Sequence, residues 1–292
     1  VLWVKDRDNY LSKYMRGLTM PFTSLLIVLI ISIISSFLGP ILGIGGGSIF
    51  IPLLDIFTDM DFKEIIAISA ATIPATALRS NSRYLKEKIT NIRLGIVTLP
   101  FVIAGAFLGA LTMLNAPEAY LRVIFGGLLF YVSYRVTKKK CFKANRYVAD
   151  PKCIFTDTYF DEGEKMQISY TPKNLKKGIP LMFIGGFASG LLGIGGGIIY
   201  TPVFLLVFNA PPKVAITLSM FLIYFGTSTS AIIFLTEQLF DPIIVAVAIM
   251  GSLTGSTFGS KVALKLKNET LRKIFGLFLG ITGARMILTA FL

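Results

Sequence analysis

Long runs of hydrophobic residues, separated by short polar segments, recur along the chain. About 20 apolar residues span a bilayer as a helix, because the backbone must hydrogen-bond internally where water is absent. The runs of 16 to 22 mostly apolar residues are Pro21–Leu38, Leu94–Met113, Ala119–Tyr134, Val214–Leu235, Pro242–Lys261 and Leu271–Leu292. The pattern predicts an all-α polytopic membrane protein.

The composition supports this interpretation. Hydrophobic residues make up 54% of the 292 residues and charged residues only 15%. Soluble domains carry about 25% charged residues, so this chain lacks the polar surface that water requires. We expect a multi-pass protein of the plasma membrane, surrounded by the lipid bilayer.

The net charge of +13 does not indicate a nucleic-acid partner. The basic residues fall mainly in short loops between apolar runs, where lysine and arginine hold loops on the cytoplasmic face, and no nucleic-acid motif accompanies them. The chain has no histidine, which removes the usual metal ligand, and we expect neither a metal nor a cofactor. Cys141 and Cys153 lie in a polar segment that we place in the cytoplasm, so free thiols are expected.

The chain repeats itself with an offset of 150 residues. Laying residues 43–135 on 193–285 without a gap gives 25 identities in 93 pairs. The stretch LGIGGG occurs at Leu42–Gly47 and again at Leu192–Gly197. The protein is therefore predicted to consist of two homologous halves.

Equivalent loops of the two halves carry opposite charge. Residues 79–93 have a net charge of +4, and their equivalents 229–243 a net charge of −2. Two further pairs also change sign: 55–64 against 205–214, and 111–121 against 261–271. Because basic loops stay in the cytoplasm, equivalent loops are expected on opposite faces. This predicts an inverted-topology repeat, as in many secondary transporters.

Inversion requires an odd number of crossings in each half. In the second half, the apolar pieces 179–192 and 197–208 are too short to span alone, so we expect a hairpin of half-helices that turns at the glycines. Three crossings follow, in 214–235, 242–262 and 271–291. The predicted organisation is a juxtamembrane segment 1–17, a first repeat 18–137, a cytoplasmic linker 138–178 and a second repeat 179–292.

Two features of the polar segments bear on this scheme. Basic residues at 5–16 precede the first apolar run and would face outside unless a further segment precedes them. In the linker, TDTYF and KMQISY are predicted to pair as a short hairpin around the turn-forming cluster 161–164.

The glycine turns are the leading candidate site. Glycine costs a helix about 1 kcal/mol relative to alanine, and irregular backbone at membrane depth survives only where it is buried or lines a wet cavity. A half-helix that begins near Gly47 or Gly197 would present free N–H groups and a positive dipole end to an anion. Spaced pairs such as Gly105/Gly109 instead favour close helix packing. The candidate substrate-binding residues at the turns are Gly43, Gly45, Gly46, Gly47, Ser48, Gly193, Gly195, Gly196 and Gly197.

Hydroxyl, amide and arginine side chains supply further candidates. The hydroxyls could donate to an oxyanion or bond back to their own helix. Arg79 could bind a sulfonate bidentately or anchor a loop, and Arg285 carries a charge close to or inside the membrane. These candidates are Thr72, Thr76, Arg79, Asn81, Tyr224, Thr227, Ser228 and Arg285.

The two repeats together resemble the sulfite exporter TauE/SafE family. The motifs are GPILGIGGGSIFIP with LRVIFG in the first half, and GLLGIGGGIIYTP with LRKIFG in the second. The leading glycine is one residue closer to the turn in the second copy (Gly190) than in the first (Gly39). The likeness extends from about residue 25 to the end of the chain. It implies transport, often outward, of sulfur-containing anions such as sulfite, sulfoacetate or other sulfonates.

Other readings of the residues stay open. An anion channel of the same fold would have the same sequence features, and the direction of transport and the oligomeric state, including a homo-oligomer, are not determined. No carboxylate lies in the middle of an apolar run, so uniport and coupling through Asp55 both remain open. A membrane enzyme is disfavoured because the chain has no HExxH motif and no paired intramembrane carboxylates.

Overall fold

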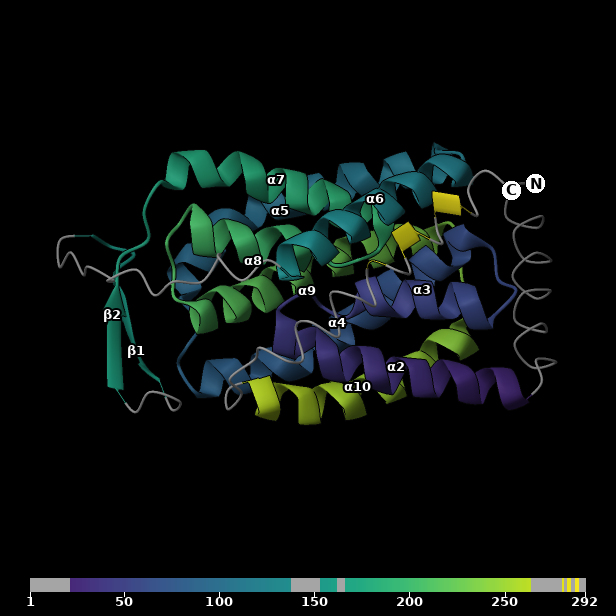
Figure 1. Ribbon diagram of the computed structural model, residues 1–292, viewed down its shortest axis with the longest axis horizontal. Helices are drawn as coiled ribbons and strands as arrows, with labels where there is room; N and C mark the ends of the chain where they lie inside the picture. The colour runs from purple at the N-terminus through teal and green to yellow at the C-terminus, as the bar shows by residue number, and fades with distance from the viewer. Residues whose placement is uncertain are drawn as a thin grey trace.

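The computed structural model describes residues 22–137, 153–161, 166–263, 280, 283–284 and 287–288. Within them the chain forms a bundle of helices with a β-hairpin at one end (Figure 1). In chain order the elements are α2 (Phe22–Leu42), α3 (Gly47–Phe57), α4 (Phe62–Lys86), α5 (Ile92–Asn115), α6 (Glu118–Thr137), β1 (Asp157–Asp161), β2 (Met166–Tyr170), α7 (Leu175–Leu192), α8 (Gly197–Leu206), α9 (Pro212–Thr236) and α10 (Pro242–Ala263). The predicted segment 1–17 lies outside the described residues.

Five of the described helices are long and apolar enough to cross a membrane: α2, α5, α7, α9 and α10. This confirms a predominantly helical, multi-pass architecture. One expectation was wrong, because α7 starts at Leu175 rather than 179 and its 18 residues reach a membrane-spanning length of about 27 Å. The predicted run Ala119–Tyr134 lies in α6, which is not among the five, and most of Leu271–Leu292 is outside the described residues.

The linker hairpin forms as predicted. Strands β1 and β2 pair antiparallel, with Asp157 opposite Tyr170 and Asp161 opposite Met166. This small sheet is an exception to the expected all-α class. Burial raises the pKa of Tyr170 above its ordinary value, so the phenol stays neutral.

The segment around the hairpin contacts both repeats. On the first repeat, the Asn91 side-chain amide donates to the carbonyl of Phe155, at 2.9 Å. On the second, the Asn174 amide donates to the carbonyl of Val207, at 3.2 Å. The linker therefore joins the α4–α5 loop to the α8–α9 loop at one end of the bundle (Figure 1).

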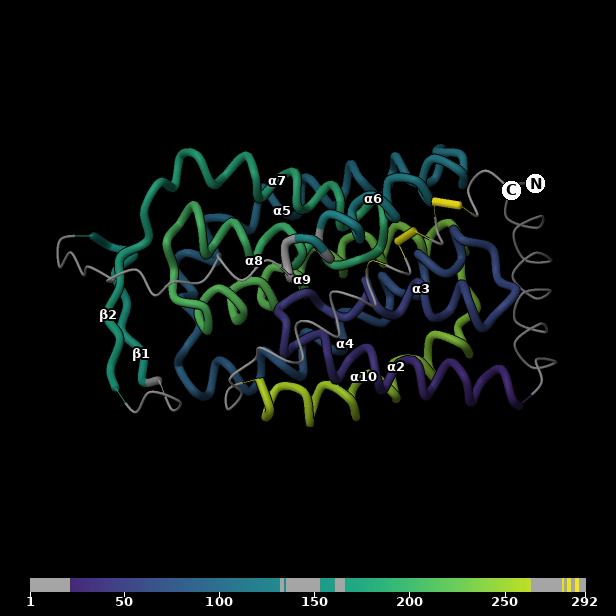
Figure 2. Tube along the Cα trace, in the orientation of Figure 1, coloured from purple at the N-terminus to yellow at the C-terminus, as the bar shows by residue number. Residues whose placement is uncertain are grey.

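The two repeats exchange equivalent helices. Helix α5 packs on α7, and its equivalent α10 packs on α2 (Figure 2). A Cβ at Gly105 of α5 would lie 2.8 Å from the backbone nitrogen of Phe187, and a Cβ at Gly255 of α10 would lie 3.0 Å from that of Phe37. Positions 187 and 37 are themselves equivalent under the 150-residue offset. The spaced glycines therefore serve close helix packing, as expected.

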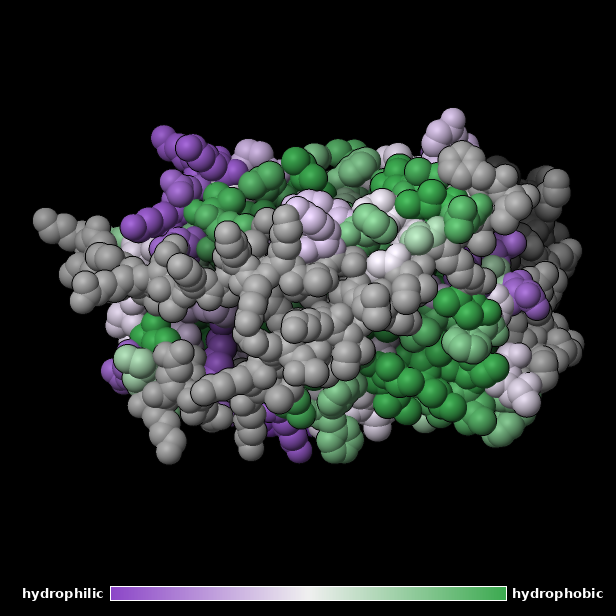
Figure 3. Space-filling view, in the orientation of Figure 1, coloured by the Kyte–Doolittle hydropathy of each residue, from purple (hydrophilic) through white to green (hydrophobic). Residues whose placement is uncertain are grey.

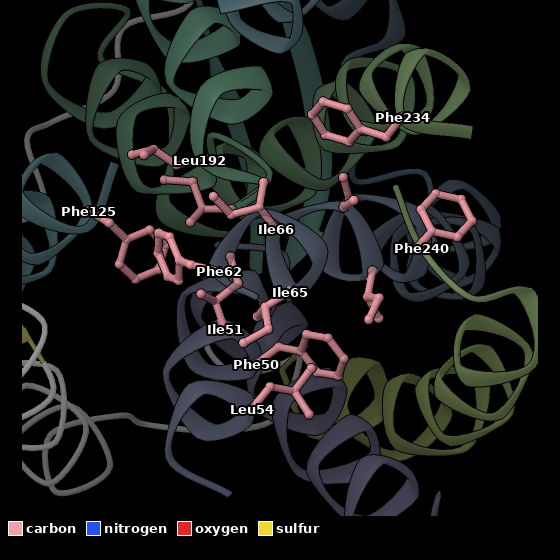
Figure 4. Close-up of a cluster of buried hydrophobic side chains, with 14 of the residues drawn as sticks. Phe50, Ile51, Leu54, Phe62, Ile65, Ile66, Phe125, Leu192, Phe234 and Phe240 are labelled. Carbon is pink, nitrogen blue, oxygen red and sulfur yellow. The ribbon is translucent and has the colours of Figure 1, made fainter. Parts of the chain in front are cut away.

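A hydrophobic core beside the turns draws on both repeats. Phe50 and Leu54 of α3 pack in one cluster with Phe62 of α4, Leu192 of α7 and Phe234 of α9 (Figure 4). The rings of Phe62 and Phe125 meet edge to face, with centroids 6.0 Å apart. Half-helix α3 packs mainly on α2 and α4 of its own half, and the cluster as a whole joins it to helices of the other half.

The outer surface is largely apolar along the helices. On α2, five large hydrophobic residues are exposed: Phe22, Leu26, Ile30, Ile33 and Ile34. Hydrophilic residues gather instead at the start of α7, near the hairpin (Figure 3). An apolar belt with polar ends suits a protein that sits in a bilayer.

Candidate anion site at the glycine turns

Both glycine motifs form tight helix breaks. Gly43, Gly45 and Gly46 have φ angles of 69°, 80° and 90°, and the equivalent Gly193, Gly195 and Gly196 have 63°, 87° and 70°. This left-handed region suits glycine because other residues meet a Cβ clash there. Each turn ends one helix and caps the N-terminus of the next, with Gly46 before α3 and Gly196 before α8. The predicted breaks are confirmed.

The two turns lie directly against each other. A Cβ at Gly47 would lie 2.8 Å from the carbonyl oxygen of Gly193, and one at Gly197 would lie 2.6 Å from the Cα of Ile44. Two equivalent isoleucines, Ile73 and Ile223, close the contact from α4 and α9. Because only glycine permits this approach, the packing itself explains part of the motif.

Hydroxyl groups fix each turn from the opposite repeat. Ser69 of α4 donates to the carbonyl of Gly193 at 2.8 Å. Thr201 of α8 donates to the carbonyl of Gly43 at 2.8 Å, and its oxygen lies 2.8 Å from the hydroxyl of Ser219. Ser69 and Ser219 are equivalent positions, but only Ser69 bonds the turn of the other repeat directly, whereas Ser219 contacts Thr201 of its own repeat.

The N-termini of the half-helices start at this junction. The carbonyl of Gly46 accepts from the amides of Ile49 and Phe50, and that of Gly196 accepts from the equivalent amides in α8. The first amides of each helix have no carbonyl one turn earlier in the helix to bond. Ser48, in the first turn of α3, is fully buried, and its hydroxyl has no hydrogen-bond partner in the described part of the chain. The junction thus combines two positive helix ends with an unpaired donor.

Most of the predicted hydroxyl candidates bond within their own helix. Thr72 donates to Ile68, Thr227 to Ile223 and Ser228 to Tyr224, each to the carbonyl four residues earlier. Thr76 is different, because its hydroxyl lies 2.7 Å from that of Ser36 on α2, in the buried interior. The Tyr224 ring packs edge to face on Phe225.

Two of the remaining candidates, Arg79 and Asn81, bond residues of the second repeat. Arg79 is exposed, and its Nε donates to the hydroxyl of Thr257 on α10 at 2.8 Å. Asn81 is buried between α4 and α9. Its amide donates to the carbonyl of Met220 at 3.0 Å, whereas its side-chain oxygen has no partner among the residues that the structure describes. Arg285 lies outside the described residues.

Comparison with known proteins identifies the family. The sequence profile of the sulfite exporter TauE/SafE family matches residues 27–286. The chain belongs to this family. It is 27% identical over 271 residues to "Probable membrane transporter protein YunE" of Bacillus subtilis, which covers 90% of this chain and 97% of that protein. It is also 27% identical over 284 residues to "Probable membrane transporter protein MJ0441" of Methanocaldococcus jannaschii, with 90% and 95% covered. No solved structure matches significantly.

This TauE/SafE protein is therefore a multi-pass membrane transporter. Within the described residues, no group of three or more histidine, cysteine, aspartate or glutamate side chains comes together in a geometry suited to a metal ion.

Several residues at the junction of this TauE/SafE transporter were missing from the sequence-based site. Ser69 and Ser219 match under the offset, and that identity was a usable signal. Thr201 and Ser36 gave no signal, because their equivalents in the other repeat are Ile51 and Gly186. Their partners become visible only once the helices are packed.

One ion pair ties the first half-helix to a neighbouring helix. Arg122 of α6 lies 2.6 Å from a carboxylate oxygen of Asp55 in α3, with 19% and 7% of the two side chains exposed. The guanidinium also stacks on the ring of Phe62, 4.5 Å from its centre. The equivalent of Asp55 is Leu205, so this charged contact belongs to one repeat only.

Proposed function

We propose that this protein is a secondary transporter that exports small sulfur-containing anions such as sulfite, sulfoacetate or other sulfonates. The substrate binds at the paired glycine turns between the two repeats. The observation that carries the proposal is the meeting of both turns, each at the N-terminus of a buried half-helix. Helix N-termini favour anions through their free N–H groups and their dipole.

The contact between the turns favours a carrier over an open channel. Gly47 lies against Gly193, and Gly197 against Ile44, so an anion enters only when the two turns separate. Rocking of one repeat against the other supplies that separation, as in other duplicated transporters. Hydroxyl contacts such as Ser69 to Gly193 would break and re-form during the cycle.

We also propose that the two repeats are inverted in the membrane. Asn81, near the end of α4, bonds Met220 in the first half of α9. Ile66, near the start of α4, lies at Gly193, whereas its equivalent Ile216 lies at Gly43. An antiparallel course of α4 and α9 would account for these contacts, and they support the inversion expected from the loop charges.

Uptake into liposomes tests the proposed transport. The purified protein is expected to take up labelled sulfite and sulfoacetate saturably, with and without an imposed pH gradient that reports on coupling. The variant Ser69→Ala loses the bond to Gly193, worth about 1 kcal/mol, and uptake should fall several-fold.

The matched control is Ser82→Ala on the same helix. Ser82 is exposed and bonds only back to Leu78 of its own helix among the described contacts, so uptake should be unchanged. Leucine at Gly46 is unsuitable as a test, because a Cβ there would lie 2.7 Å from the carbonyl of Ser35 and damage the fold. Failure of well-folded wild-type protein to take up either anion would refute the proposed substrate class.

A further inference from the structure

Three buried polar side chains in the glycine hairpins break the internal repeat. Ser48 replaces the equivalent of Ile198, Ser189 the equivalent of Gly39, and Tyr200 the equivalent of Phe50. The hydroxyls of all three are buried and have no hydrogen-bond partner among the described residues. A buried hydroxyl without a partner is costly, so such a group calls for a partner that binds from outside. Two of the three belong to the second hairpin.

The Tyr200 phenol lies at the N-terminus of its own helix, α8. A Cβ at Gly196, the N-cap, would lie 2.7 Å from the ring carbon that carries the hydroxyl. A Cβ at Gly226 of α9 would lie 3.7 Å from the hydroxyl oxygen itself. The hydroxyl therefore lies between the start of α8 and helix α9, and Tyr200 as a whole is fully buried.

Ser189 lies on the same face of α7 as this ring. The Tyr200 ring covers Gly185, with a ring carbon 2.8 Å from the place of a Cβ there. Ser189 follows Gly185 by four residues, which is one helical turn on the same face. Its hydroxyl is a second buried donor without a partner among the described residues, one helical turn from the glycine that the Tyr200 ring covers.

Among the described residues, no lysine or arginine is buried with these donors. The buried carboxylate of Asp241 caps α10 in the α9–α10 loop by accepting from the amide of Ile243, and the largely buried carboxylate of Asp55 pairs with Arg122. The electrostatic cost of burying an ion rises with the square of its charge. Neutral hydroxyls and a helix N-terminus, worth about half an elementary charge, offset one negative charge far better than two.

We propose that Tyr200, Ser189 and the N-terminus of α8 bind the substrate, and that this site selects singly charged oxyanions over doubly charged ones. Sulfonates with one charge and hydrogensulfite fit it, whereas sulfate and sulfoacetate, which both carry two charges at neutral pH, do not, so the inference narrows the proposed substrate class to singly charged anions. The proposal rests on the proposed function and adds the residues and the charge class. Within the junction of the paired turns, the second glycine hairpin then supplies the side-chain ligands, and the first hairpin packs against it and completes the site.

The variant Tyr200→Phe tests the site with a side chain that the first repeat already uses at Phe50. Methanesulfonate should raise the thermal unfolding temperature of the detergent-solubilised wild type and should compete with sulfite uptake, and sulfate should do neither. In Tyr200→Phe the stabilisation should vanish and uptake should fall at least tenfold. Without ligand the unfolding temperature should be equal or higher, because an unpaired hydroxyl has been removed.

The matched control is Tyr170→Phe, a buried tyrosine of the hairpin, which should respond to methanesulfonate as the wild type does. Wild-type sulfite uptake should also rise at lower pH, as hydrogensulfite replaces the doubly charged form. If the Tyr200 hydroxyl bonds only a water molecule, Tyr200→Phe will bind methanesulfonate as the wild type does. That result would overturn the proposed substrate site. Equal competition by sulfate would overturn the charge selection. In both cases, sulfite uptake by the wild type would still support the proposed transport function. If the wild type takes up no sulfite, the proposed transport function is overturned as well.

Discussion

Gly109 and Gly127 differ sharply in what surrounds them, and this difference is testable at the scale of single residues. A Cβ at Gly109 would lie 2.9 Å from the backbone nitrogen of Leu191, whereas a Cβ at Gly127 would meet no described atom within 4 Å. We expect Gly109→Ala to lower the free energy of unfolding by about 1–3 kcal/mol through overpacking. Gly127→Ala should leave it unchanged or raise it by up to about 1 kcal/mol, because alanine favours helix.

The unfolding temperature of each variant is measured by heating the protein and recording, by size-exclusion chromatography, how much remains folded. A stable Gly109→Ala protein with wild-type unfolding behaviour would contradict the close packing of α5 on α7. A strongly destabilised Gly127→Ala protein would show that Gly127, on α6, has a close neighbour that the described contacts do not include.

Residue-scale contacts were only partly predictable from the sequence. The glycine breaks followed from composition and duplication, because four glycines in six residues cannot continue a helix. The partners of Ser69 and Thr201 did not follow, since each hydroxyl bonds a carbonyl more than 120 residues away. The hydroxyls of Thr72 and Thr227 instead donate to carbonyls of their own helices. The sequence alone does not distinguish such a bond from a bond to a ligand.

At the scale of elements, an ion pair between Asp55 and Arg122 joins half-helix α3 to α6. We expect Arg122→Leu to lower the free energy of unfolding by about 3 kcal/mol, because it leaves a largely buried carboxylate without this partner. The double variant Asp55→Leu with Arg122→Leu should recover most of that loss, since leucine already stands at the equivalent position 205.

A double-mutant cycle of unfolding midpoints measures this coupling. Purely additive losses would show that the two side chains do not stabilise the half-helix together. Sulfite uptake by the double variant also tests whether Asp55 couples transport to a proton gradient. If the imposed pH gradient no longer changes uptake, this coupling is supported; if the gradient changes uptake as in the wild type, coupling through Asp55 is excluded.

The limits of elements were harder to predict than their existence. The break between α2 and α3 and the β1–β2 pairing followed from glycine clustering and alternating residues. The start of α7 was placed too late because Lys176 and Lys177 look like loop residues, yet they form exposed first-turn positions of the helix. Long side chains at a membrane boundary can snorkel, so charge does not mark the end of a helix there.

At the scale of the whole molecule, the duplication predicted two halves but not how they interlock. Helix α5 of the first repeat packs on α7 of the second, and α10 packs back on α2. This exchange places both glycine turns at one junction, which a side-by-side pair of repeats would not do. The central claim is that two oppositely oriented copies of one fold meet there and share the transport site.

Thiol labelling from the two sides of the membrane tests this claim most directly. Lys88 and Gln238 end equivalent helices with the same φ of 52° and the same capping bonds, so they form a matched pair. Each is replaced by cysteine in a protein with Cys141 and Cys153 changed to serine, and a membrane-impermeant maleimide is applied to intact cells and to inverted vesicles. We expect residue 88 to react from the cytoplasmic side only and residue 238 from the outside only. Reaction of both from the same side would contradict the inverted arrangement and, with it, the shared site at the glycine turns.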